Sequence, residues 1–156
     1  MALHQYFIIA MAFLIGLVSP NLFAGTISEI AQDHQVVLGK MFSSWTPSAK
    51  QTKEALRQVQ SFLEKPDGQG ERNKAEIRKI LENKSGYRVQ FMGVEREGKR
   101  VVVCNFFPAP DPKFQDQFKT WRDSLVVVDD GGFYFWQIEY DPVTGKCLKF
   151  QSNGSI

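Results

Sequence analysis

Two periodicities divide the chain, and one replaces the other near Gly86. Before that residue, apolar side chains recur at the three- and four-residue spacing of amphipathic helices; after it, they alternate with polar side chains as in strands. Helices followed by strands with short connections are typical of an α+β domain whose helices cover one face of an antiparallel sheet. The pattern therefore predicts an α+β fold of cystatin-like or related roll type, with three helices before about five antiparallel strands.

The helical half begins with two capping boxes, in which a Ser or Thr is followed three residues later by Glu or Gln. Thr26 and Glu29 open a predicted first helix whose apolar stripe runs to Trp45. Ser48 and Gln51 open the second. The sequence thus predicts two consecutive amphipathic helices.

Proline and glycine mark the remaining helix boundaries. The second helix stops before Pro66, because proline disrupts a helix interior. A third, shorter helix carries Ile77 and Ile80 and ends at Ser85-Gly86, where glycine suits a left-handed cap. All three helices therefore precede the strands.

Five segments of the second half have the composition and alternation of strands. They are Tyr87–Glu95, Arg100–Phe107, Leu125–Val128, Phe133–Tyr140 and Cys147–Ser152. Residues 96–99, 129–132 and 141–146 contain the Gly, Asp and Pro residues of turns between them. A longer, proline-containing connection follows Phe107.

The first 24 residues contain no Asp, Glu, Lys or Arg. The run Tyr6–Val18 is apolar, Pro20 ends it, and Ala24 supplies a small residue for cleavage. The uninterrupted run is shorter than the roughly 20 residues that cross a bilayer, so it favours a cleaved signal peptide over a retained anchor. We therefore expect a signal peptide at 1–24, a single α+β domain at 25–156, and a periplasmic or secreted protein without a stable membrane anchor.

The charged residues are mixed in sign along the chain, with 19 Lys and Arg against 17 Asp and Glu. Nucleic-acid binding needs basic residues gathered on one surface, and the densest basic stretch, 72–84, is interleaved with glutamates. The composition therefore indicates no nucleic-acid partner and leaves an unidentified protein or a small ligand.

Two cysteines, Cys104 and Cys147, are present. In an oxidising compartment an even number of cysteines favours a disulfide. The alternative is a pair of free thiols on separate strands, since Cys104 shares a strand face with apolar neighbours and Cys147 with polar ones. The sequence leaves both open.

The strand half resembles that of small exported bacterial proteins of unknown function. The matching residues are Tyr87–Phe91, Gly93, Asn105–Phe107, Val127–Gly132, Phe135-Trp136, Tyr140-Asp141 and Asn153-Gly154. This resemblance implies a bacterial exported context and supports the fold, and it implies no activity.

Catalytic and metal-binding patterns are weak in this chain. His34 is the one histidine after the predicted signal peptide, on an apolar stripe where packing is the usual role, so neither a metal site nor a histidine relay is predicted. Asp129, Asp130 and Asp141 lack the spacing of a calcium loop and suit turns instead. We predict no catalytic residue and no cofactor.

The aromatic run from Phe133 to Trp136 is the strongest candidate surface. Strand alternation places Phe133, Phe135 and Gln137 on one face, and Tyr134 and Trp136 on the other. We expect the Trp136 face to pack beneath the helices. The Phe135 face is then covered by a loop such as Pro108–Thr120, or forms a groove for a ligand or partner.

These observations favour a non-enzymatic exported binding or interaction module. Two other functions stay open: a small hydrolase that uses Asp or Glu carboxylates, and a regulator or inhibitor of an exported peptidase. The last rests on the segment Tyr140–Lys146, which is similar to the strand–turn ending of PepSY domains.

Overall fold

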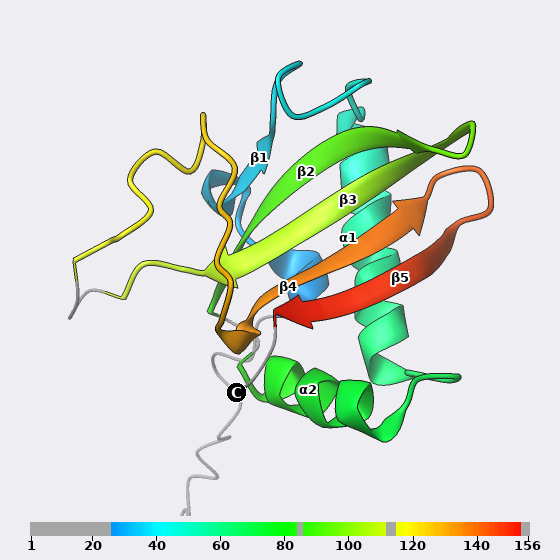
Figure 1. Ribbon diagram of the computed structural model, residues 1–156, viewed down its shortest axis with the longest axis vertical. Coiled ribbons are helices and arrows are strands. Elements are labelled where there is room, and N and C mark those ends of the chain that lie inside the picture. Colours follow the sequence, from blue (N-terminus) through cyan, green and yellow to red (C-terminus); the bar gives the residue numbers. More distant parts are fainter. Residues whose placement is uncertain (1–25, 84–85, 112–114, 154–156) are drawn as a thin grey trace, which may run out of the picture.

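The computed structural model describes residues 26–83, 86–111 and 115–153. Within these residues the fold is α+β, with two α-helices and one five-stranded sheet (Figure 1). The helices are α1 (Ala49–Glu64) and α2 (Glu71–Glu82). In order across the sheet, the strands are β1 (Gln35–Val37), β2 (Tyr87–Arg96), β3 (Lys99–Pro108), β4 (Gly132–Asp141) and β5 (Lys146–Asn153). β1 is parallel to β2, and the other neighbours are antiparallel.

The prediction of three helices on an antiparallel sheet is wrong at the start of the chain. The Thr26–Glu29 capping box is present, but it opens only a 3₁₀ turn, Ile27–Glu29. A second turn, Gln32–His34, leads into β1, whose parallel pairing makes the sheet mixed. Tertiary burial outweighs the helical periodicity here, because the apolar residues of this segment pack on both sides of the sheet edge. Ile27 is buried on the helix side and Leu38 on the opposite side, which one straight helix could not achieve.

The predicted strand Leu125–Val128 is also absent, and residues 129–132 are therefore not a hairpin turn. This segment crosses the sheet as an extended connection without a backbone ladder. Its backbone is bonded by side chains of the sheet instead: Asn153 Nδ2 of β5 donates to Val128 O, and Gln90 and Asn105 bond to Val126, as described below. The sequence pattern identified an apolar run but not its hydrogen-bond partners.

α1 and α2 form where the second and third helices are predicted, but α2 ends at Glu82, with Asn83 as its C-cap, and not at the predicted Ser85-Gly86. At the start of α1, Ser48 Oγ accepts from Gln51 N at 3.3 Å, and Gln51 Oε1 accepts from Ser48 N at 2.9 Å. Both helices bury one apolar face, with Leu56 and Val59 of α1 and Ile77 of α2 among the buried residues. This burial against the sheet stabilises helices that would be marginal alone.

A two-residue turn sets the register of the central hairpin. Glu97 and Gly98 have φ values of 50° and 74°, the left-handed conformations of a tight hairpin loop, as predicted for residues 96–99. From this turn β2 and β3 pair in unbroken register to Tyr87 and Pro108. The register decides which side chains share a face of the sheet.

The main core lies between the helices and one face of the sheet. Trp136 is fully buried there and stacks on Phe106, with ring centroids 3.8 Å apart and planes 7° from parallel. Tyr87 and Phe150 approach the same indole. Figure 1 shows α1 running behind the sheet and α2 at one end of it. This face is the structural core of the protein.

The opposite face of the sheet, which we name the outer face, is covered by a loop and not by helices. Residues 115–131, which we name the strap, cross it between β3 and β4 (Figure 1, yellow to orange). Trp121 and Val126 of the strap are buried with Phe107 of β3, and Phe118 and Phe135 pack at their margin. A loop therefore covers the outer face beside Phe135.

Past the end of β1, the backbone of Ser44 and Trp45 lies against the edge of β2 at Gly93. Ser44 N and Trp45 N both donate to the Gly93 carbonyl, at 2.8 and 3.3 Å. A Cβ at position 93 would lie 2.2 Å from the Trp45 carbonyl oxygen, so only glycine permits this approach.

Candidate ligand-binding site

Side-chain amides on the outer face hold the strap. Gln90, Asn105 and Gln137 are neighbours in register across β2, β3 and β4. Asn105 Nδ2 donates to Gln90 Oε1 at 2.9 Å, and Gln137 Nε2 donates to Asn105 Oδ1 at 3.0 Å. The three amides form a continuous ladder, which we name the amide ladder.

Gln90 is the member of the amide ladder that bonds most to the strap. Its Nε2 donates to the carbonyls of Trp121 and Ser124 at 2.5 and 2.8 Å, and its Oε1 accepts from Val126 N at 3.0 Å. Asn105 Nδ2 adds a bond to Val126 O at 2.9 Å. Gln90 is fully buried, so these bonds replace the water that its amide would otherwise bind.

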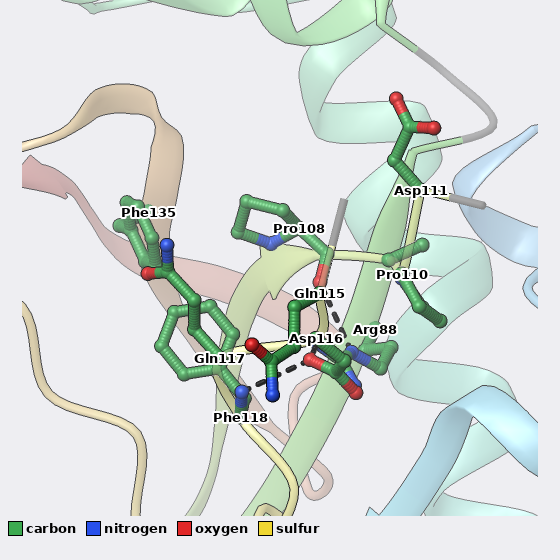
Figure 2. Close-up of a pocket in the computed structure, with 10 residues that line it drawn as sticks. Arg88, Pro108, Pro110, Asp111, Gln115, Asp116, Gln117, Phe118 and Phe135 are labelled. Carbon is green, nitrogen blue, oxygen red and sulfur yellow. Dashed lines mark hydrogen bonds and ion pairs between the residues drawn. The ribbon is translucent and has the colours of Figure 1, made fainter. Parts of the chain in front are cut away.

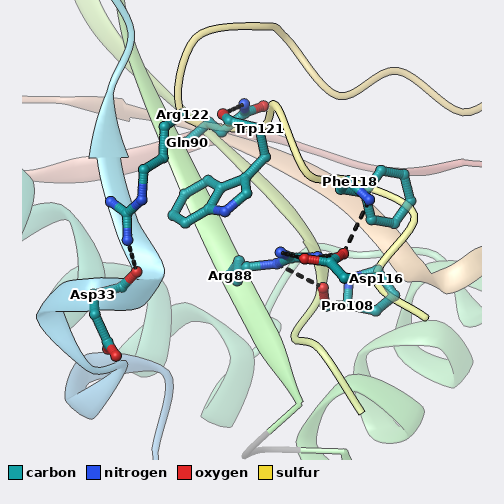
Figure 3. A network of polar contacts seen from close by, with 8 residues as sticks. All are labelled: Asp33, Arg88, Gln90, Pro108, Asp116, Phe118, Trp121 and Arg122. Carbon is teal, nitrogen blue, oxygen red and sulfur yellow. Dashed lines mark hydrogen bonds and ion pairs between the residues drawn. The ribbon is translucent and has the colours of Figure 1, made fainter. Parts of the chain in front are cut away.

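Arg88, two residues before Gln90 on the same face, forms a buried ion pair with the strap. Its Nη1 and Nη2 donate to the two Asp116 oxygens at 2.8 and 2.9 Å, and its Nε donates to Pro108 O at 3.0 Å (Figure 3). The Arg88 side chain is 2% exposed and that of Asp116 is 28% exposed. A buried arginine is tolerated when its donors are used in this bidentate way.

Aromatic rings surround the guanidinium. The Arg88 Cζ atom lies 4.8 Å from the ring centre of Phe107, 5.4 Å from that of Trp121 and 5.7 Å from that of Phe118. Arg122 lies 4.5 Å from the Trp121 ring and also donates to Asp33 O, as Figure 3 shows. Cation–π attraction therefore adds to the ion pair in positioning the first half of the strap.

The ion pair favours the ionised form of Asp116. Hydrogen bonds from Arg88 hold the pKa of the carboxyl below its ordinary value, and the Phe118 amide, which donates to Oδ1 at 2.9 Å, acts in the same direction. Partial burial opposes them. Asp116 is therefore ionised at neutral pH and is unsuited to donate a proton as a general acid.

A cavity of about 280 Å³ lies where the strap begins (Figure 2). Phe135 of β4 forms one wall and Phe118 of the strap another, and Pro108 and Pro110 contribute further apolar surface. The paired charges of Arg88 and Asp116 also line the cavity, which is open to solvent. Asp111, Gln115 and Gln117 complete its polar lining. Apolar walls combined with a few fixed polar groups are typical of small-ligand sites.

The structure separates the three side chains predicted to share a groove. Phe135 lines the cavity, and Gln137 lies on the same face in the amide ladder. Phe133 instead packs against the helix-side core, with Lys79 Nζ 5.7 Å from its ring centre. A register irregularity between Gly132 and Trp136 interrupts the strand alternation and turns Phe133 to the other side.

Cys104 and Cys147 are both free thiols in the structure. Cys104 lies on β3 and Cys147 on β5, with β4 between them. Two strand spacings amount to about 9–10 Å, beyond the roughly 7 Å between Cα atoms that a disulfide can span. Burial raises the pKa of Cys147 to about 12 and that of Cys104 well above its ordinary value, so neither is a ready nucleophile.

The other residues that the sequence analysis considered for catalysis or metal binding lie in or beside turns. His34 ends a 3₁₀ turn, and Asp141 Oδ1 accepts from the amides of Val143 and Thr144 in the turn after β4. Across the described ranges, no three His, Cys, Asp or Glu side chains gather as metal ligands.

Within the same ranges, neither α1 nor α2 is long and apolar enough to span a bilayer. The predicted signal peptide lies outside the described residues.

Sequence reasoning missed Arg88, Gln90, Asn105 and Asp116. The signal for the first two was present, because Arg88 and Gln90 alternate with Tyr87, Val89 and Phe91 on a strand. A polar face of that kind is usually solvated, and nothing local indicates that a distant loop covers it. Asp116 carries no such signal, since its role depends on a contact 28 residues away.

No family model, curated protein or solved structure matches this chain. The functional assignment therefore depends on the geometry of the site.

Proposed function

We propose that this is an exported, non-enzymatic binding protein that takes a small, largely apolar ligand in the cavity beside Phe135. The observation that carries the proposal is the cavity itself, whose walls combine apolar side chains with polar ones, among them one charged pair fixed by hydrogen bonds. Its volume of about 280 Å³ is near the lower end of known ligand sites, which suits a small ligand. The charge-free residues 1–24 support export.

The geometry favours binding over carboxylate-dependent hydrolysis. A hydrolase of that class needs one carboxyl group that can donate a proton and a second that stays ionised. Two carboxyl groups line the cavity, those of Asp111 and Asp116. Asp116 is ionised and engaged by Arg88, so it fits neither a general acid nor a free nucleophile, and Asp111 alone cannot supply both carboxyl groups. Regulation of a peptidase through the turn after Tyr140 is the remaining alternative, but Asp141 is already used within that turn.

Replacing Phe135 with alanine should weaken ligand binding. We expect 3-phenyl-1-propanol, an apolar and uncharged probe, to bind the wild-type protein saturably. Loss of the Phe135 wall should reduce its affinity about tenfold, the effect of one aromatic contact of about 1.4 kcal/mol. Isothermal titration calorimetry on both proteins measures this difference.

Tyr134→Ala is the matched control, because Tyr134 is the adjacent aromatic residue, is 46% exposed and does not line the cavity. It should bind the probe as the wild type does. Absence of saturable binding to the wild type, or equal losses in both variants, would contradict the proposed function.

A further inference from the structure

The carboxylate that Arg88 binds comes from the strap and lies in the wall of the cavity. Nη1 and Nη2 contact the two Asp116 oxygens, whereas only Nε bonds to the backbone of β3. Two parallel N–H···O bonds are the geometry with which arginine recognises a carboxylate, whether on a side chain or on a ligand. Asp116 thus occupies the position that the carboxylate of a ligand would take (Figure 2).

We propose that the cavity takes a small carboxylic acid with an apolar body, and that its carboxylate replaces Asp116 on Arg88. The apolar body then lies against Phe118 and Phe135. This inference rests on the proposed function, because it names the ligand class of the same cavity. Asp116 is a built-in competitor that occupies the anion position in the unliganded protein.

The burial of Arg88 explains why only an anion can make this exchange. The side chain is 2% exposed, and a buried guanidinium without an anionic partner is strongly unfavourable. A neutral or cationic ligand leaves Asp116 where it is. A carboxylate supplies the missing charge as Asp116 departs, so the number of ion pairs is unchanged and burial of the apolar body decides the equilibrium.

Asp116 has a position to move to when it is displaced. Its side chain is already 28% exposed, and the exposed Lys119 belongs to the same segment. Lys119 and Asp116 also line a second hollow on the solvent side of the strap. The released carboxylate therefore gains water and a nearby cation, which lowers the cost of the exchange.

The single guanidinium among apolar rings favours a carboxylate over a phosphate. Arg88 carries one positive charge, and Phe107, Phe118 and Trp121 surround it. A phosphate bears close to two negative charges at neutral pH, and the second would have no cationic partner in a cavity whose lining also includes the carboxyl group of Asp111. The ligand is therefore a monoanion.

Asp116→Ala should create a protein that binds carboxylates tightly. At pH 7, we expect 3-phenylpropionate to bind this variant about tenfold or more tightly than it binds the wild type, because the competitor is gone. The uncharged 3-phenyl-1-propanol should bind both proteins within about twofold. Adding Arg88→Met to Asp116→Ala should abolish the preference for the carboxylate. Calorimetry measures all three proteins with both probes.

The outcomes separate this inference from the proposed function. Binding of both probes with no gain for the carboxylate in Asp116→Ala overturns the inference and leaves the cavity a ligand site. Tighter binding of 3-phenylpropylamine or inorganic phosphate than of 3-phenylpropionate also overturns it. Failure of every probe overturns both proposals.

A measurement on the wild type keeps the inference testable if Asp116→Ala does not fold. The Nη–H groups of Arg88, which donate to Asp116, give a nuclear magnetic resonance signal of their own, which reports on the anion that the guanidinium binds. Saturation with 3-phenylpropionate should shift that signal, and saturation with 3-phenyl-1-propanol should leave it in place. An unchanged Arg88 signal at saturating carboxylate contradicts the exchange.

Discussion

Trp136→Ala should lower the free energy of unfolding by about 3–5 kcal/mol. The indole is fully buried, stacks on Phe106 at 3.8 Å and meets Tyr87 edge-on at 5.8 Å. Its removal leaves a cavity between sheet and helices that the packed rings around it cannot close. Thermal melts should show a fall in melting temperature of roughly 10–20 °C.

Phe135→Ala is the control for this prediction, because Phe135 is the adjacent residue of β4 and lies on the other face. It is half-buried at the cavity and contacts Phe118 at the edge of the outer-face cluster. We expect a loss of about 1–2 kcal/mol. A stable Trp136→Ala protein beside an unfolded Phe135→Ala protein would show that the two faces are assigned the wrong way round.

Gln90→Leu should release the strap, which makes it the second large expected effect. Leucine is similar in size but cannot replace the bonds to Trp121 O, Ser124 O and Val126 N, all of which lie at a buried contact. Unpaired buried polar groups cost about 1–3 kcal/mol each, so we expect a total loss of about 3 kcal/mol or more. Urea denaturation measures the total.

Limited trypsin digestion locates the Gln90→Leu effect. Cleavage after Lys119 and Arg122, both in the strap, should become faster in the variant. Gln137→Leu is the matched control, because Gln137 belongs to the same amide ladder but, among the described residues, bonds through its side chain to Asn105 and not to the strap. Unchanged cleavage in Gln90→Leu, or equal acceleration in both variants, would mean that the amide ladder does not hold the strap.

Capping boxes and turn residues predicted the boundaries of helices and turns correctly where interactions within a few residues determine the structure. The Ser48–Gln51 capping box and the glycine of the 96–99 turn mark real boundaries, because each is satisfied within a few residues. The Thr26–Glu29 box also forms, yet no helix follows it. There the competing interaction is distant: Ile27 N donates to Gln60 Oε1, 33 residues away.

The candidate site was only partly predictable for the same reason. Alternation correctly placed Trp136 in the helix-side core and Phe135 on the opposite face. It placed Phe133 on the wrong face, because a strict two-residue alternation does not allow for the register shift between Gly132 and Trp136. The Arg88–Asp116 pair joins a strand to a loop without secondary structure, and no periodicity links such residues.

A nuclear magnetic resonance titration of the wild-type protein with 3-phenyl-1-propanol tests the central claim most directly. If the cavity beside Phe135 is a ligand site, the backbone amide signals that shift saturably should be those of Phe118, Phe135 and their neighbours, while those of α1 stay unchanged. Saturable shifts centred on α1 or on the turn after Asp141, or no saturable shift at all, would contradict the account.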